Sequence, residues 1–139
     1  MDSALPGYLM VGSKTPADEL SELPASALAE LGPLLARVED AVHRVLQTQR
    51  VYIGRYGHAL GYRAHFHIVP VYDWVETLCW EDARYRILED LAESPVKATD
   101  GAELTLFVWR EFCERAVPPA IKGPSVSEAI GLLKAAMRP

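Results

Sequence analysis

Two histidines, His65 and His67, stand two residues apart in the run RAHFHIVP at 63–70. In an extended strand alternate side chains leave the same face, so Arg63, His65 and His67 are expected to line one side. Both imidazoles would then face one shared space, where they can serve as nucleophile, hydrogen-bond donor or metal ligand. A purely structural role is disfavoured, because two adjacent buried imidazoles need two sets of hydrogen-bond partners.

The first half of the chain predicts the elements that hold this strand. A short apolar run at 8–12 indicates a first strand. Apolar residues spaced alternately three and four apart indicate an amphipathic helix over 25–46, with a kink or restart at Pro33. Residues 50–54 indicate a second strand, and a glycine-punctuated loop joins it to the histidine strand as an antiparallel hairpin.

The second half predicts further elements with less distinctive patterns. We expect a helix over 81–91 and a strand over 103–111, the second because leucine, phenylalanine, valine and tryptophan favour strands. Ser125 and Glu128 form a capping-box pattern, which predicts a terminal helix. The expected fold class is α+β, an antiparallel β-sheet packed with a long helix.

Composition limits the kinds of partner. A chain of 139 residues is the size of one domain, so 1–139 is expected to form a single unit with its core at about 7–72 and an extension at 73–139. A net charge of −5 without a basic stripe argues against binding to a nucleic acid duplex. No membrane span, signal segment or disulfide pattern is evident, which favours a cytoplasmic protein with free thiols.

The ordered set of strand, long helix, strand, glycine loop and HxH strand resembles the histidine triad (HIT) family of nucleotide hydrolases and transferases. AHFHIVP at 64–70 is similar to the second half of that family's HxHxHxx signature, with His65 at the middle histidine and His67 at the last. GYLMVGSK at 7–14 also resembles the family's strand before the helix. The similar region covers about half of the chain.

The resemblance implies a reaction without metal or other cofactor. His65 would attack the α-phosphorus of a small nucleotide derivative and form a nucleotidyl-histidine, which water or another acceptor then releases. His67 would stabilise the charge on an oxygen. Family members are usually homodimers, so a homodimer is the expected assembly. The dinucleoside polyphosphates and the nucleoside phosphoramidates both remain possible substrate classes.

Two positions depart from the family pattern. The family's first histidine falls on Arg63, which is either a phosphate clamp or a solvated arginine. The preceding loop lacks the family's glutamine and hydroxyl residues and offers only His58 and backbone amides, so His58 is either a leaving-group donor or a bystander. The segment that encloses the nucleoside in relatives also has no match. Residues 73–80 or 103–111, from this or a partner subunit, are candidates for that wall.

Two alternatives to an enzyme stay open. The first is a nucleotide-binding protein of the same fold with little turnover, motivated by Arg63. The second is a zinc or iron site on His65 and His67, which needs at least a third ligand; Asp73 and Glu76 are the available candidates, although no spacing selects either.

Overall fold

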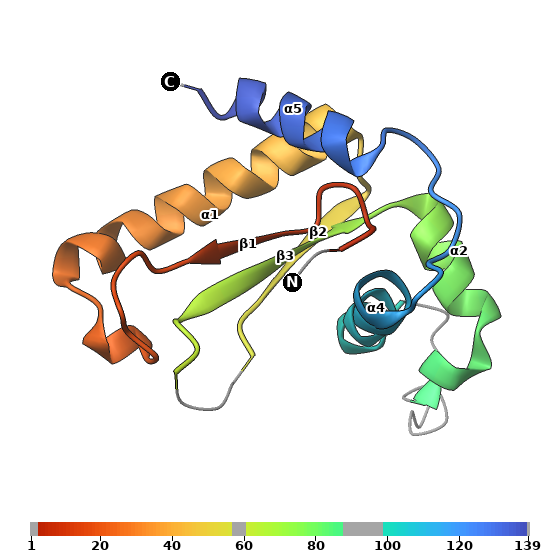
Figure 1. Ribbon diagram of the computed structural model, residues 1–139, viewed down its shortest axis with the longest axis horizontal. Helices are drawn as coiled ribbons and strands as arrows, with labels where there is room; N and C mark the ends of the chain where they lie inside the picture. Colours follow the sequence, from red (N-terminus) through yellow and green to blue (C-terminus); the bar gives the residue numbers. More distant parts are fainter. Residues whose placement is uncertain (1–2, 57–60, 88–98, 139) are drawn as a thin grey trace.

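The computed structural model describes residues 3–56, 61–87 and 99–138, and it confirms an α+β fold. An antiparallel sheet lies between α1 and α5 on one side and α2 and α4 on the other (Figure 1). The elements, in chain order, are β1 (Leu9–Gly12), η1 (Leu20–Glu22), α1 (Ala25–Leu46), β2 (Arg50–Gly54), β3 (His65–Val71), α2 (Asp73–Glu81), η2 (Ala83–Tyr85), α4 (Gly101–Val108), η3 (Trp109–Glu114) and α5 (Val126–Ala136).

The histidines lie on the central strand of the sheet. The strand order is β1-β3-β2, and both pairings are antiparallel, as the hairpin pattern predicts. In this register His65 pairs with Gly12, while His67 lies between Met10 of β1 and Gly54 of β2. Directly paired residues share a face of the sheet, so glycines border the histidines on that face. The sheet therefore fixes both imidazoles on its most constrained strand and leaves room beside them.

The long helix α1 covers the opposite face of the sheet. Its buried residues recur at helical spacing, as predicted, and the helix contacts β2 and β3. They are Val38, Ala41, Val42 and Leu46. The helix continues through Pro33 without the restart that the sequence suggested. Pro33 is exposed, and tertiary packing of the later turns holds the helix together despite its missing N–H.

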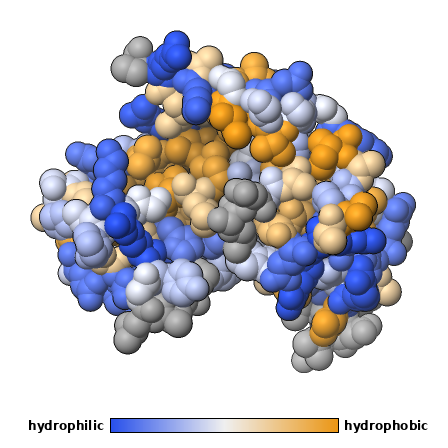
Figure 2. All heavy atoms as spheres, in the orientation of Figure 1, coloured by the Kyte–Doolittle hydropathy of each residue, from blue (hydrophilic) through white to orange (hydrophobic). Residues whose placement is uncertain are grey.

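The terminal helix α5 is confirmed together with its capping box. The Ser125 hydroxyl accepts from the Glu128 backbone N–H, and the Glu128 carboxylate accepts from the Ser125 N–H. Buried Ala129 and Leu133 join the core of which α1 is part, and Figure 1 shows the two helices side by side. On the face drawn in Figure 2, hydrophobic side chains gather over these helices.

The strand predicted over 103–111 is wrong, because this segment is helical. It forms α4, followed by the π-helical turn η3. Asp100 is the N-cap of α4, and its carboxylate accepts from the N–H groups of Ala102 and Glu103. The buried hydrophobic residues are Leu104, Phe107, Val108 and Phe112, which recur at a helical and not an alternating period. Tertiary packing thus overrides the strand propensity of individual residues.

The structure describes only the first part of the helix predicted over 81–91. Helix α2 spans Asp73–Glu81, the short turn η2 follows at Ala83–Tyr85, and residues 88–91 lie outside the described part of the chain. The buried side chains Val75 and Cys79, four apart, form the inner face of α2. Both cysteines, Cys79 and Cys113, are free thiols. Within the described residues, every helix is too short or too polar to cross a membrane.

Candidate functional site

His65 begins strand β3, and its backbone neighbour fixes one side of its ring. The Nδ1 atom of His65 lies 2.7 Å from the carbonyl oxygen of Arg63. A carbonyl oxygen can only accept a hydrogen bond, so Nδ1 carries the proton. The Nε2 atom of a neutral His65 ring is then the one with the lone pair. His65 is half-buried, unlike the fully buried His67.

His67 links His65 to a tyrosine from the neighbouring strand region. Its Nε2 atom lies 3.1 Å from Nε2 of His65, and the two ring centroids are 4.8 Å apart. On the other side its Nδ1 atom lies 2.6 Å from the hydroxyl of Tyr8. The two imidazoles therefore share one space, as the strand spacing predicts, and they contact each other directly.

The hydrogen-bond chain has one consistent direction when both rings are neutral. Since the lone pair of His65 is on Nε2, the proton in the His65–His67 contact belongs to His67 Nε2. His67 Nδ1 then accepts, and the Tyr8 hydroxyl donates to it. Burial, with smaller contributions from Cys113 and Tyr56, raises the pKa of Tyr8 above its ordinary value, so this hydroxyl keeps its proton. The chain runs from Tyr8 through His67 to the lone pair of His65.

Tyr8 is a site residue that the sequence interpretation missed. It was assigned only to the first strand, yet its position two residues before Met10 carries the signal. Met10 pairs with His67 across β1 and β3, and side chains two apart share a face of a strand. Knowledge of the strand register would have been needed to place Tyr8 beside His67.

Replacing Tyr8 with phenylalanine is expected to change the protonation pattern of His67. Without the donor, Nδ1 of His67 loses its hydrogen bond, and the ring is free to exchange between its two neutral tautomers. We expect the ¹⁵N chemical shifts of His67 to move toward the averaged values of an exchanging imidazole. We also expect a loss of about 1 kcal/mol in the free energy of unfolding, because one buried hydrogen bond is lost.

The matched control is Tyr62→Phe, which changes a tyrosine that is 60% exposed. It should leave the His67 spectrum as in the unmodified protein. If the His67 spectrum were also unchanged in the Tyr8→Phe variant, Tyr8 would not be the hydrogen-bond donor to Nδ1 of His67.

Aromatic side chains surround His67 on its remaining sides. The ring centroids of Tyr56 and Trp109 lie 5.4 Å and 5.9 Å from that of His67. Gly54 permits the approach of Tyr56, since an added Cβ at this glycine would lie 2.9 Å from the Tyr56 hydroxyl oxygen. The sequence gives 103–111 as a candidate wall, but it predicts a strand there and so does not place Trp109 beside His67.

These side chains form the walls of a cavity of about 330 Å³ beside His67. Residues from one side of α4 and the start of η3 complete the lining. The full lining is Tyr56, His67, Ala102, Thr105, Leu106, Trp109 and Arg110. Apolar and aromatic groups dominate it, and Arg110 contributes the one cation among these residues. The cavity can hold a flat apolar group next to the histidines.

Of the two other residues singled out in the sequence, only Arg63 is described by the structure, and it does not line this cavity. The Arg63 side chain is exposed, and its guanidinium donates to the carbonyl oxygen of Lys14 at 3.2 Å. The backbone of Arg63, through the bond to His65, is what contacts the histidine pair. His58 lies outside the described residues. Substrate binding by either side chain stays a prediction.

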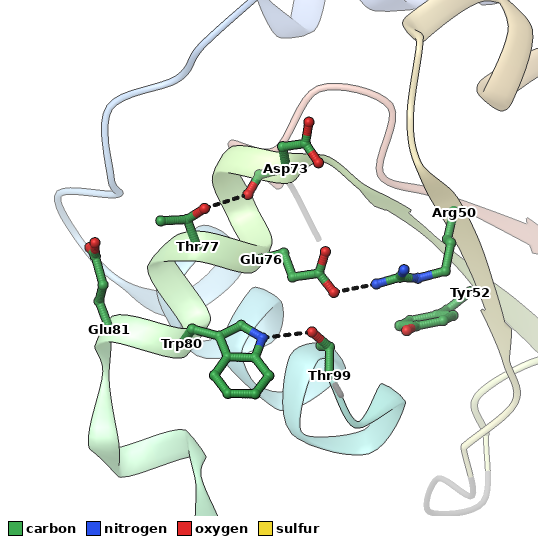
Figure 3. Close-up of a pocket in the computed structure, with 8 residues that line it drawn as sticks. All are labelled: Arg50, Tyr52, Asp73, Glu76, Thr77, Trp80, Glu81 and Thr99. Atoms are coloured by element: carbon green, nitrogen blue, oxygen red, sulfur yellow. Dashed lines mark hydrogen bonds and ion pairs between the residues drawn. The ribbon is translucent and has the colours of Figure 1, made fainter. Parts of the chain in front are cut away.

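A larger cavity, of about 880 Å³, lies away from the histidines (Figure 3). Arg50 and Tyr52 of β2 line it, and in the sheet they pair with Val71 and Val69, toward the far end of β3. Helix α2 supplies most of the rest, including Glu76, which forms an ion pair with Arg50. The histidines are absent from its lining.

The metal-site alternative lacks a third ligand in the described part of the chain. Asp73 and Glu76, the two carboxylates considered for it, line the larger cavity and not the one beside His67. Residues 3–56, 61–87 and 99–138 contain no group of three or more His, Cys, Asp or Glu side chains that could hold a metal ion.

Comparison with known proteins supports the fold. No protein-family model and no curated protein sequence matches the chain. A solved structure does: the crystal structure, with an unknown ligand, of a Hit-like protein involved in cell-cycle regulation from Bartonella henselae. The TM-score is 0.52, the identity is 16%, and the alignment covers 99% of this chain and 77% of that one. The fold is HIT-like.

The HIT-like fold agrees with the ordered set of elements that suggested it. The alignment spans nearly the whole chain, so it includes the C-terminal half as well as the histidine strand. At this level of identity the likeness shows the fold alone, and activity is a separate question.

Proposed function

We propose that this HIT-like protein cleaves a nucleotide derivative at its α-phosphate through a covalent intermediate on His65. The observation that carries the proposal is the orientation of the His65 ring. Its Nδ1–H is held by the carbonyl of Arg63, and its Nε2 lone pair faces His67. An imidazole held this way is a nucleophile with one defined attacking atom.

The first chemical step forms a bond between Nε2 of His65 and the α-phosphorus and breaks the bond to the leaving group. The leaving group departs with the bonding electron pair. The His67 N–H, which contacts His65 Nε2 in the free protein, donates to an oxygen of the phosphate instead and stabilises its charge. After transfer, the His65 ring carries both phosphorus and the Nδ1 proton, and its positive charge is stabilised by the Arg63 carbonyl.

The second step releases the nucleotide. Water adds to phosphorus, and the P–N bond returns its electron pair to Nε2 of His65. One proton of the water stays on the nucleoside monophosphate, and the other goes to solvent. The positively charged ring is a good leaving group, so no metal ion is required for this step.

With His65, His67 and Tyr8 all neutral, we expect a phosphoanhydride to be a better substrate than a phosphoramidate. A phosphate leaving group departs as a stable anion, whereas an amine needs a proton as it leaves. Neutral His67 could supply that proton only by becoming an imidazolate or by taking one from Tyr8, whose pKa is raised. Dinucleoside polyphosphates are therefore expected to react faster than nucleoside phosphoramidates.

The cavity beside His67 is proposed to hold the flat apolar part of the substrate. Filling it with Ala102→Phe is expected to raise KM about tenfold and to change kcat little, because the burial of a ring against Tyr56 and Trp109 is lost. Steady-state kinetics with a dinucleoside polyphosphate provide the measurement. Ala29→Phe, at an exposed position of α1, is the control. An unchanged KM in the Ala102→Phe variant would place the base elsewhere.

Turnover in the presence of a chelator tests the proposed reaction. Diadenosine polyphosphates and an adenosine phosphoramidate are incubated with the purified protein, and the release of nucleoside monophosphate is followed by chromatography. The proposal predicts release from at least the polyphosphates. Measurable nucleotide binding without turnover would instead support the second candidate, a binding protein on this fold. That candidate is favoured by the Arg63 side chain, which contacts the Lys14 carbonyl and not the site cavity.

A further inference from the structure

The π-helical turn η3 carries one wall of the histidine site. Trp109, its first residue, contacts the ring of His67 at 69° between the ring planes, which is an edge-to-face arrangement. The turn is closed by a bond from the Arg115 N–H to the Arg110 carbonyl at 3.1 Å, a spacing of five residues. A π-turn is a rare widening of a helix and persists where tertiary contacts stabilise it.

A buried carboxylate lies inside this turn. Glu111 is only 4% exposed, and its side chain accepts from the Tyr85 hydroxyl at 2.8 Å and from Arg84 at 3.0 Å. Arg115 donates to its other oxygen. Burial alone would raise the pKa of Glu111, but hydrogen bonds from Tyr85 and Arg115 outweigh it and lower the pKa. The carboxylate is thus charged and tied to η2 as well as to the end of η3.

These contacts select one arrangement of the turn. Glu111 lies two residues after Trp109, and its bonds to Arg84 and Tyr85 of η2 prevent rotation of the segment about its axis. At the same time the indole N–H of Trp109 donates to Glu114 at 2.6 Å across five residues, a pair that stacks along the axis in a π-turn. In a regular α-helical turn, Trp109 would occupy a different position relative to His67 and to Glu114.

We propose that Glu111 is a positioning residue for the histidine site, whose buried carboxylate locks the π-turn η3 and so holds Trp109 against His67. This inference concerns the geometry of the site and does not depend on the proposed reaction. It assigns a role to the one described carboxylate that is buried and contacts two arginines.

The test uses NMR spectra of the histidine rings in the full chain without substrate. The aromatic ring of Trp109 shifts the ring-proton resonances of His67, and Trp109→Leu defines the size and direction of that effect. In Glu111→Gln we expect the His67 resonances to move in the direction set by Trp109→Leu. Adding Glu111→Gln to Trp109→Leu should cause no further movement. Glu111→Asp, which keeps the charge, should restore the resonances in part.

A control separates positioning from general stability. Val42→Ala removes volume from the fully buried face of α1 and is expected to lower stability without moving the His67 resonances. If Glu111→Gln does not fold, Tyr85→Phe removes a single bond to the carboxylate and is expected to give a smaller shift in the same direction. Loss of stability in Glu111→Gln or Tyr85→Phe with unmoved His67 resonances would overturn the proposal.

Discussion

Replacing His65 with alanine is expected to lower metal-free turnover by at least about a thousandfold, since it removes the atom that attacks phosphorus. The fold should be retained, because His65 is half-buried and its hydrogen bonds include those to a backbone carbonyl oxygen and to the neighbouring ring of His67. The loss should fall on kcat, whereas nucleotide affinity should be little changed. Single-turnover kinetics and nucleotide titration of the same preparation give both quantities.

His43→Ala is the matched control for this experiment. His43 is an exposed histidine of α1, so its loss removes an imidazole without touching the site. Turnover should be unchanged. Comparable turnover in the His65→Ala variant would show that another group attacks phosphorus, and the covalent mechanism would have to be abandoned.

The change His67→Ala is expected to damage both activity and stability. The N–H that stabilises the phosphate oxygen is lost, which we expect to lower kcat by about a hundred- to a thousandfold. The Tyr8 hydroxyl also loses its acceptor, and a ring that is 2% exposed leaves a cavity. The free energy of unfolding should therefore fall by about 2–5 kcal/mol. Steady-state kinetics and urea denaturation measure the two effects.

A second substitution distinguishes the two sources of this stability loss. Removing both partners of a buried hydrogen bond costs less than removing one. The variant with both Tyr8→Phe and His67→Ala should be more stable than the sum of the single losses predicts, while its kcat stays low. Strict additivity of the two stability losses would show that the 2.6 Å contact between Tyr8 and His67 contributes little.

Strong local patterns in the sequence were sufficient to predict the frame of this fold. The helix over 25–46 and the strand over 50–54 have the predicted bounds, because one has a sustained helical period and the other a turn on each side. The start of α5 was predictable for the same reason, because its capping box depends only on residues of the first helical turn. The shared face of His65 and His67 followed from strand geometry alone.

The covering layer over the histidines was not predictable in the same way. Residues 103–111 are rich in strand-forming side chains, and only their packing against the rest of the core decides that Leu104, Phe107 and Val108 point inward on a helix. The segment had been considered as a wall of the site, and it does line the cavity, but as α4 and η3. The single-unit organisation of 1–139 and the homodimer stay predictions.

The residues around the histidines depend on contacts between distant parts of the chain. Tyr8 and His67 are separated by 59 residues, and only the register of β1 against β3 joins them. Trp109, which contacts His67, is the first residue of the π-turn, and no sequence pattern was available for that turn. Long-range register and rare helical geometry are therefore what the sequence alone left open.

Detection of a nucleotide bound covalently to His65 would establish the proposed intermediate. The protein is mixed with a diadenosine polyphosphate and a chelator, quenched in alkali during turnover, and digested for mass spectrometry. We expect an adenylyl group on the peptide that contains His65, attached through Nε2, and its absence from the His65→Ala variant. Continued turnover with no adduct on His65 under these conditions would contradict the proposed intermediate.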